Sequence, residues 1–198
     1  FVTPLFLGII AGATVSGKIN TEAQSFPDAF LNPWLNPFSL MVGLFTVALC
    51  GFLAAVYLVG EAESESDRNS FIRKARNANI FAVVLGSFVF WSAETEGIPL
   101  VRWVFGTTIG FGAVVAATLS LAVLWVVIRH RNRFIGRVLV GFQVTMILLA
   151  ISYEHFPDFV ILQSGENLSL LEHHAPEKTI KALGWALLAG SVFILPFL

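Results

Sequence analysis

PFSLMVGLFTVALCGFLAAVYLVG, residues 37–60, is the stretch of sequence that decides the fold. It contains no charged residue, and it is longer than the roughly 20 apolar residues that a helix needs to cross a bilayer core about 30 Å thick. The whole chain has the same character, because 56% of its 198 residues are hydrophobic and only 13% are charged. A soluble domain has about 25% charged residues, so the composition predicts a membrane protein.

Five further apolar runs divide the chain in the same way. About six spans are predicted, at 1–16, 37–60, 77–93, 103–128, 134–153 and 180–198. The first and last are short, and no basic segment precedes Phe1, so we expect one transmembrane domain (1–198) that is the C-terminal part of a longer subunit, truncated at both ends. The predicted fold class is an all-α, polytopic transmembrane helix bundle.

The positions of the charged residues support this division. Cytoplasmic loops of membrane proteins are enriched in Lys and Arg. Eight of the twelve basic residues fall in two predicted loops, 61–76 and 129–137, whereas the other three connections hold four basic residues and nine acidic ones. Basic and acidic loops alternate along the chain, so we expect 61–76 and 129–137 to be cytoplasmic.

Two Asn-Pro pairs precede the run at 37–60. Asn36 is predicted to cap this helix, and Pro37 suits its first position because proline has no N–H to leave unbonded. Asn32-Pro33 makes an earlier turn, and Trp34 between the two pairs is expected to lie at the membrane surface. We therefore predict that Trp34, Asn36 and Pro37 fix where the helix starts.

Small residues at four-residue spacing indicate where helices pack, because close backbone contact drives helix association in lipid. The predicted packing residues are Gly8, Gly12, Gly43, Gly106 and Gly110. Polar residues inside the spans are expected to form hydrogen bonds between helices; they are Thr107, Thr108, Thr118, Ser120, Gln143 and Thr145.

The sequence offers few candidates for chemistry. The central parts of the four middle spans contain no Asp, Glu, Lys or His, although such residues usually mark ion paths and cofactors in membranes. His155, just after the run 134–153, is the one position that suits a ligand, and a boundary histidine is the simpler interpretation. The single cysteine, Cys50, is interpreted as a small buried apolar residue. We predict no catalytic, cofactor-binding or metal-binding residue in this chain.

Basic residues in the two predicted cytoplasmic loops are candidates for contacts with anionic lipid headgroups. Each such charge contributes about 1 kcal/mol at a membrane surface. The candidates are Arg73, Lys74, Arg76, Arg131 and Arg133.

Two segments carry a resemblance to a known family. The Gly-spaced segment FVTPLFLGIIAGATVSGKI (1–19) is followed, after an acidic loop, by Leu35-Asn36-Pro37-Phe38, Gly43 and Tyr57-Leu58. In this order they resemble the second half of subunit II of cytochrome bd-type quinol oxidases, and residues 155–190 resemble its later part more loosely. The chain departs from the family at 16–19, where a Gly-Val-Pro-Phe turn is absent, and at 160–162, where a proline is absent.

The resemblance implies a function for the complex and a role for the chain. The complex would be a terminal oxidase that transfers electrons from quinol, its substrate, to oxygen. Subunit I would be the partner that carries b-type and d-type haems, and this chain a non-haem structural subunit that is not catalytic alone. The further partners implied are membrane lipids and a small single-span subunit, but no nucleic acid, in the cytoplasmic (inner) membrane of a bacterium or archaeon.

Two alternatives stay open from the sequence. The first is half of a secondary transporter, which needs a site near the middle of the membrane made by broken helices; Pro4 and Pro196 lie inside apolar runs where such breaks would occur. The second is a membrane scaffold protein without an enzyme partner. The transporter would act without haem, and the scaffold would purify alone and colourless.

Overall fold

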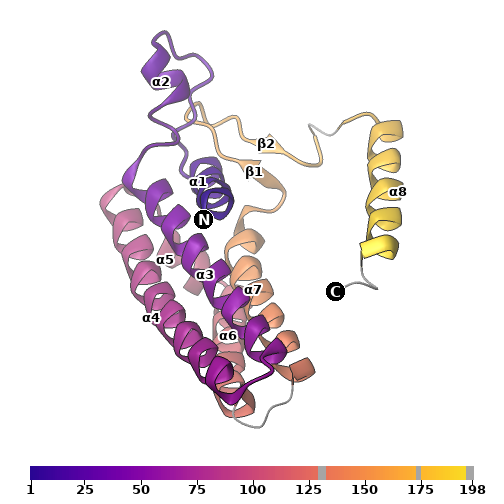
Figure 1. Ribbon diagram of the computed structural model, residues 1–198. Helices are drawn as coiled ribbons and strands as arrows, with labels where there is room; N and C mark the ends of the chain where they lie inside the picture. The colour runs from indigo at the N-terminus through magenta and orange to yellow at the C-terminus, as the bar shows by residue number, and fades with distance from the viewer. Residues whose placement is uncertain (129–132, 173–174, 195–198) are drawn as a thin grey trace.

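The computed structural model describes residues 1–128, 133–172 and 175–194, which form a helical bundle with one small hairpin (Figure 1). Its long helices are α3 (Pro37–Glu61), α4 (Glu65–Thr95), α6 (Thr108–Val127) and α7 (Arg133–His155). The shorter helices are α1 (Val2–Val15), α2 (Phe26–Phe30), α5 (Leu100–Phe105) and α8 (Glu177–Ile194). Among the described helices, α3, α4, α6 and α7 are long and apolar enough to cross a membrane, and α1 is a shorter apolar helix. The predicted all-α membrane bundle is confirmed.

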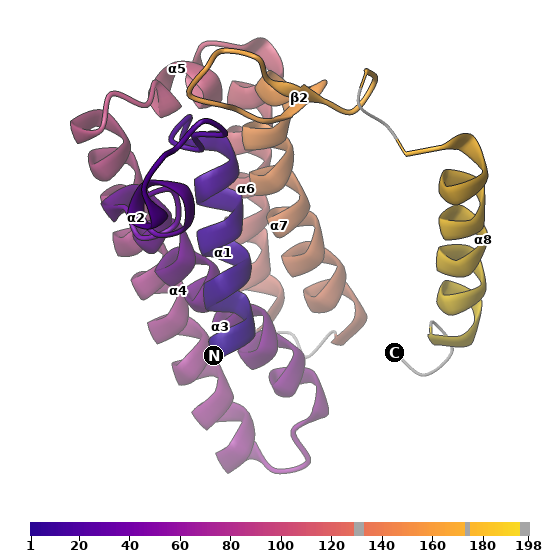
Figure 2. The ribbon, with the colours of Figure 1, turned by 90° about the horizontal axis from the view of Figure 1, so that it is seen from above.

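Helix α3 is the centre of the bundle. It packs against α1, α4 and α7, and α6 packs against α7 (Figures 1 and 2). The buried residues form two clusters toward opposite ends of α3, one that includes Phe38 and one that includes Phe52. Each cluster draws side chains from α3, α4, α6 and α7, so the four long helices hold together along most of their length.

Residues 65–76 are helical, although the sequence predicted a loop over 61–76. Only residues 62–64 connect α3 to α4. Ser64 caps α4, because its hydroxyl oxygen accepts the backbone N–H of Asp67 at 3.0 Å. Hydropathy finds only the part of a helix that is apolar, so it missed the polar turns at the start of α4.

The predicted span 103–128 is divided into α5 and α6. Gly106 ends α5, and Thr107 caps α6 by accepting the N–H of Gly110 at 3.1 Å. The site of a Cβ on Gly110 lies 2.5 Å from the carbonyl oxygen of Val104. A Cβ on Gly106 would likewise meet a carbonyl of α5. These two glycines therefore permit a tight turn, whereas the sequence had placed them on a contact ridge between helices.

A hairpin follows α7, where the sequence predicted only an acidic loop. Strands β1 (Asp158–Val160) and β2 (Leu168–Ser169) pair antiparallel. The N–H of Ile161 donates to the carbonyl of Thr14 at 2.8 Å, and that of Gln163 donates to the carbonyl of Ile19 at 2.9 Å. These bonds connect the hairpin to the end of α1, so two connections far apart in sequence form one structure at this end of the bundle.

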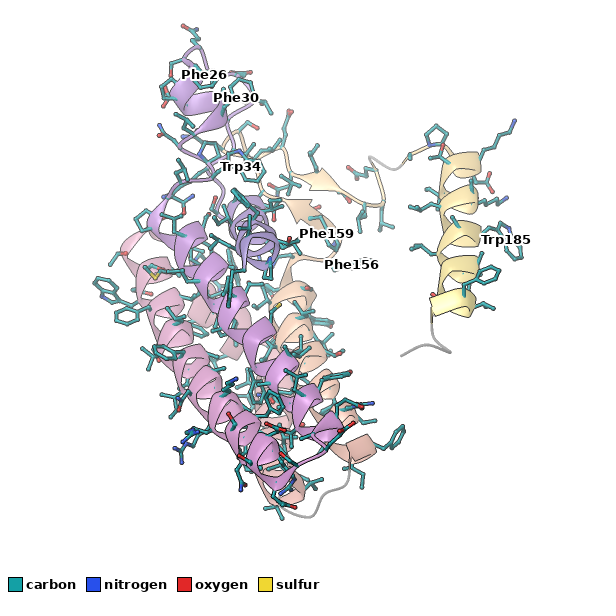
Figure 3. The ribbon with its side chains drawn as sticks, in the orientation of Figure 1. Phe26, Phe30, Trp34, Phe156, Phe159 and Trp185 are labelled. Carbon is teal, nitrogen blue, oxygen red and sulfur yellow. The ribbon has the colours of Figure 1, made fainter. Side chains whose placement is uncertain are left out.

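Much apolar surface is exposed. Helix α8 stands apart from the bundle in both views, and Trp185 lies on its side away from the other helices (Figures 1–3). Cys50, which the sequence predicted to be buried, is exposed, because it lies on a face of α3 that no other described helix covers. Exposed apolar faces of this kind are what a lipid bilayer or a second membrane subunit would cover.

Candidate functional site

The first turn of α3, Asn36–Ser39, is the best-supported polar site in the described chain. Pro37 has no N–H to satisfy. The N–H of Phe38 donates to Glu96 Oε1 at 3.0 Å, and the N–H of Ser39 donates to Asn36 Oδ1 at 2.8 Å. The N–H groups of Phe38 and Ser39 thus have partners, which matters because both residues are buried and an unpaired buried N–H is costly.

Trp34 lies just before this turn. Its backbone N–H donates to the carbonyl of Leu31 at 3.1 Å, and the Asn36 side-chain amide donates to the carbonyl of Pro33 at 2.8 Å. The Trp34 side chain is half-buried below α2, which projects from the end of the bundle (Figure 3). The two Asn-Pro pairs therefore build one compact turn that leads into α3.

An ion pair joins three segments at this turn. Glu96 ends α4 and Lys18 follows α1, and the carboxylate Oε2 of Glu96 contacts Lys18 Nζ while its Oε1 binds the first turn of α3. The Glu96 side chain is only 10% exposed. A carboxylate at a helix N-terminus is also favoured by the helix dipole, so Glu96 ties α1, α3 and α4 together.

Two glycines with positive φ place the members of this ion pair. Gly97, at φ +72°, follows Glu96, the C-cap residue of α4, and the N–H of Ile98 donates back to the carbonyl of Ala93 at 2.8 Å. This is the Schellman arrangement in which glycine terminates a helix. Gly17, at φ +68°, turns the chain just before Lys18. Both charged residues thus adjoin a turn that only glycine adopts without strain.

Below this turn, α1 and α3 pack through glycines. A Cβ on Gly12 would lie 2.8 Å from the Cα of Ser39, and a Cβ on Gly43 would lie 2.8 Å from the side chain of Ile9 and 2.9 Å from the carbonyl of Leu5. Three of the glycines predicted to pack, Gly8, Gly12 and Gly43, therefore lie in one contact between two helices.

Some polar residues inside the spans form hydrogen bonds between helices, and others form them within their own helix. Ser120 of α6 donates its hydroxyl to the carbonyl of Leu139 in α7 at 2.9 Å, which is a bond between helices as predicted. Thr118 and Thr145 instead donate to carbonyls four residues back in their own helices. Gln143 is buried, and its Oε1 has no hydrogen-bond partner among the described residues.

At the opposite end of the bundle, Arg137 of α7 forms an ion pair with Glu61, the last residue of α3. Its guanidinium also lies 5.3 Å from the centre of the Tyr57 ring, a cation–π distance. Arg68 donates to the carbonyl of Ile128 across the bundle. These basic residues connect α3, α4, α6 and α7 at this end.

The residues predicted to contact lipid headgroups are spread over two helices. Arg73, Lys74 and Arg76 are exposed on α4, and Lys74 Nζ lies 5.3 Å from the centre of the Phe71 ring. Arg133 begins α7. Arg131 lies outside the described residues.

His155 has the geometry of a packed boundary residue. Its Nδ1 lies 2.9 Å from the carbonyl of Ile151, so Nδ1 carries the proton of the neutral ring, and the ring stands edge-on to Trp103 with 4.4 Å between centroids. Nε2 is fully buried and has no hydrogen-bond partner among the described residues. Within those residues no cluster of three metal-ligating side chains occurs. The buried Nε2 therefore does not suit a haem or metal without repacking; the other histidines, His130, His173 and His174, lie outside the described residues.

The helix breaks that a transporter would need do not occur at the positions considered from the sequence. Pro4 lies in the first turn of α1, which runs unbroken to Val15. Proline is tolerated in a first helical turn because the N–H it lacks has no partner there. Pro196 lies outside the described residues.

Glu96 and Lys18 are the residues that sequence reasoning missed. They are 78 positions apart, and each was counted only as a loop charge. The available signal was their position: both adjoin a glycine at the end of a predicted span, on the same side of the membrane, with opposite charge.

Comparison with known proteins identifies a family for the whole chain. A family model described as cytochrome bd terminal oxidase subunit II matches residues 1–198. No curated protein gives a significant match.

Proposed function

The chain belongs to the family of subunit II of cytochrome bd terminal oxidases, and from this premise we propose that it is the haem-free, structural subunit of the complex. The family makes it a subunit of a haem-containing quinol oxidase with subunit I as partner. The four long apolar helices make it a multi-pass integral membrane protein. The proposed role is to hold subunit I in its active form while that subunit transfers electrons from quinol to oxygen.

The observation that carries the proposal is the set of bonds that the Glu96 carboxylate forms. It is the most buried carboxylate in an ion pair of the described chain, and both of its oxygens are occupied, one by Lys18 and one by the N–H of Phe38. A carboxylate bound in this way serves as a clamp, because its two oxygens bond two different segments and its own backbone ends a third. The charged groups at the other end, Arg137 and Glu61, also connect helices.

The haems are proposed to lie in subunit I. When bound they supply the electron-transfer and oxygen chemistry, b-type and d-type haem being the types that we expect. The described residues here contribute only His155 as a ligand candidate, and its buried Nε2 does not suit the group. The residues of this chain would instead exclude water at the interface and fix the orientation of the helices that subunit I contacts.

The orientation is proposed from the charges. The end of the bundle that carries Arg68, Arg73, Lys74, Arg76 and Arg137 would face the cytoplasm, because basic residues are retained on that side. The membrane would then be the cytoplasmic (inner) membrane of a bacterium or archaeon, and the Asn36 turn would lie at its outer surface. A small single-span subunit and membrane lipids would complete the complex.

The test is a reduced-minus-oxidised absorption spectrum of the complex that co-purifies with the tagged full-length subunit in mild detergent. Bands of b-type haem with a red-shifted chlorin-type haem are expected. A colourless preparation of native size would overturn the oxidase assignment.

A second preparation locates the haems. The tagged subunit is produced in cells that lack subunit I, and the membranes are purified in the same way. The proposal expects a colourless subunit, whereas haem bands in this preparation would overturn the haem-free role.

A further inference from the structure

We propose that the outward face of α4 binds one anionic phospholipid, with its phosphate at Arg73 and Arg76 and an acyl chain along the helix below them. Helix α4 lies at the edge of the bundle in both views (Figures 1 and 2). The inference goes beyond the oxidase role and does not rest on it.

One face of α4 carries exposed residues from its basic end to its far end. With 3.6 residues per turn, six of them fall within a stripe about 120° wide; we call them the α4 stripe, and they are Arg73, Arg76, Ile80, Val84, Phe88 and Trp91. All six side chains are exposed. The buried residues Ala75, Ala82 and Val89 lie on the opposite face, which packs against the bundle.

The basic end of the stripe fits a phosphate group. Arg73 and Arg76 are three residues apart, so they are neighbours on the helix surface. Both are exposed, and neither has an ion-pair or hydrogen-bond partner in the described part of the chain. No acidic residue occurs between positions 73 and 91. Guanidinium groups bind phosphate with two parallel N–H donors, so the unpaired pair is complementary to an anionic headgroup.

The two arginines also lie at the level of the headgroups. The 31 residues of α4 give a helix about 46 Å long at 1.5 Å per residue. The hydrocarbon core is about 30 Å thick, so roughly the first ten residues extend beyond it on the basic side. Arg73 and Arg76 therefore come near the point where α4 enters the core.

The apolar part of the stripe provides a place for an acyl chain. A shallow groove is lined by Val84, Ser87, Phe88 and Trp91. The Phe88 and Trp91 rings form its wall, edge to face with 6.2 Å between their centroids. At 1.5 Å per residue Val84, the near end of the groove, lies about 12 Å along the helix from Arg76, which is within one leaflet of a bilayer. Trp91 lies about 22 Å from Arg76, beyond the middle of the core. A lipid with its phosphate at the arginines thus reaches Val84 with its chain.

Val84→Trp gives the inference a direct test, because position 84 is exposed and within reach of the acyl chain. The full complex is placed in bilayer discs of phosphatidylcholine that contain a small share of either phosphatidylglycerol or phosphatidylcholine with brominated acyl chains. Bromine quenches tryptophan fluorescence on contact, and the signal is the difference between the Val84→Trp complex and the parent complex. We expect a preference of roughly thirtyfold for the anionic lipid, the scale given by two charges at a surface.

Matched variants assign the preference to the stripe. Arg73→Gln with Arg76→Gln should bring the preference close to parity. Lys178→Gln with Lys181→Gln removes the same number of charges from α8, which stands apart from α4, and should leave the preference intact.

Two results would overturn the inference, and both come from the chain with its arginines intact. Equal quenching by the two lipids would mean ordinary lipid contact without headgroup recognition. Absence of quenching by either lipid would mean that a protein partner covers the stripe. Since the signal is read from the Val84→Trp variant and not from a haem, a colourless preparation would overturn the oxidase assignment and leave this inference standing.

Discussion

Gly8 of α1 faces Gly43 of α3 so closely that a Cβ atom on Gly8 would lie 2.7 Å from the Gly43 Cα. The same Cβ would lie 2.5 Å from the Thr46 hydroxyl oxygen and 2.7 Å from the carbonyl oxygen of Val42. Two of these three atoms belong to the backbone, so no rotamer change in α3 makes room. The contact between α1 and α3 therefore requires glycine at position 8.

Gly8→Ala is expected to lower the thermal stability of the complex. The two helices must separate to admit the methyl group, and overpacking of this kind costs about 1–3 kcal/mol. The midpoint of thermal unfolding in mild detergent is the measurement.

Gly51→Ala is the matched control, because a Cβ on Gly51 would meet no atom within 4 Å. Alanine is the better helix former by about 1 kcal/mol, so this variant should keep or raise the midpoint. An unchanged midpoint for Gly8→Ala would contradict the packing of α1 on α3.

The spacing of the glycines predicted some of the contacts in the structure but not others. The four-residue spacing predicted that Gly8, Gly12 and Gly43 pack, and the structure places Gly8 against Gly43 and Gly12 against Ser39. Gly106 and Gly110 have the same spacing, yet they lie at a turn, because Thr107 begins a new helix between them. Spacing alone does not distinguish a helix contact from a helix boundary.

Asn36→Ala with Pro37→Ala is expected to lower the yield of assembled complex without abolishing turnover. The change removes the acceptor for the N–H of Ser39, which is buried, and loss of such a cap costs about 1 kcal/mol. Yield is measured as purified complex per membrane protein, and turnover as quinol oxidation per haem.

Asn36→Ser is the control for this pair of changes. Serine also accepts a hydrogen bond at a helix N-cap, so its yield should stay near that of the parent. A normal yield of inactive complex in the Ala variant would contradict a structural role for this turn.

Glu96→Gln should weaken the complex through the loss of its ion pair alone. The amide oxygen of Gln can still accept the N–H of Phe38, while the charge opposite Lys18 is gone. A double-mutant cycle with Lys18→Met, read from unfolding free energies, should give a coupling on the order of 1–3 kcal/mol.

The exposed pair of Glu177 and Lys181 on α8 provides the comparison. Its side chains are 80% and 70% exposed, and a surface pair of this spacing contributes only about 0.3–0.5 kcal/mol. Equal coupling in the two cycles would mean that Glu96 is not the clamp between α1, α3 and α4.

The ion pair and the extension of α4 were both missed from the sequence, for different reasons. Lys18 and Glu96 meet because three helix ends converge, and only the assembled fold supplies that convergence. The turns at 65–76 are polar, so hydropathy had no signal there. A local signal did exist, since Ser64 is followed three residues later by Asp67, a pattern that begins helices. The loop prediction at 61–76 failed because it rested on the charged residues of this segment and did not consider helix capping.

His155→Phe is expected to leave both the thermal midpoint and the haem spectrum unchanged. Phenylalanine can keep the edge-on contact with Trp103, and it removes a buried Nε2 that has no partner among the described residues. Removing an unsatisfied buried nitrogen offsets the loss of the bond from Nδ1 to the carbonyl of Ile151. His155→Ala should instead lower the midpoint, with a cost on the order of 2 kcal/mol from the cavity. If His155→Phe loses a haem band while its midpoint stays normal, His155 serves the cofactor directly and the haem-free assignment of this chain fails.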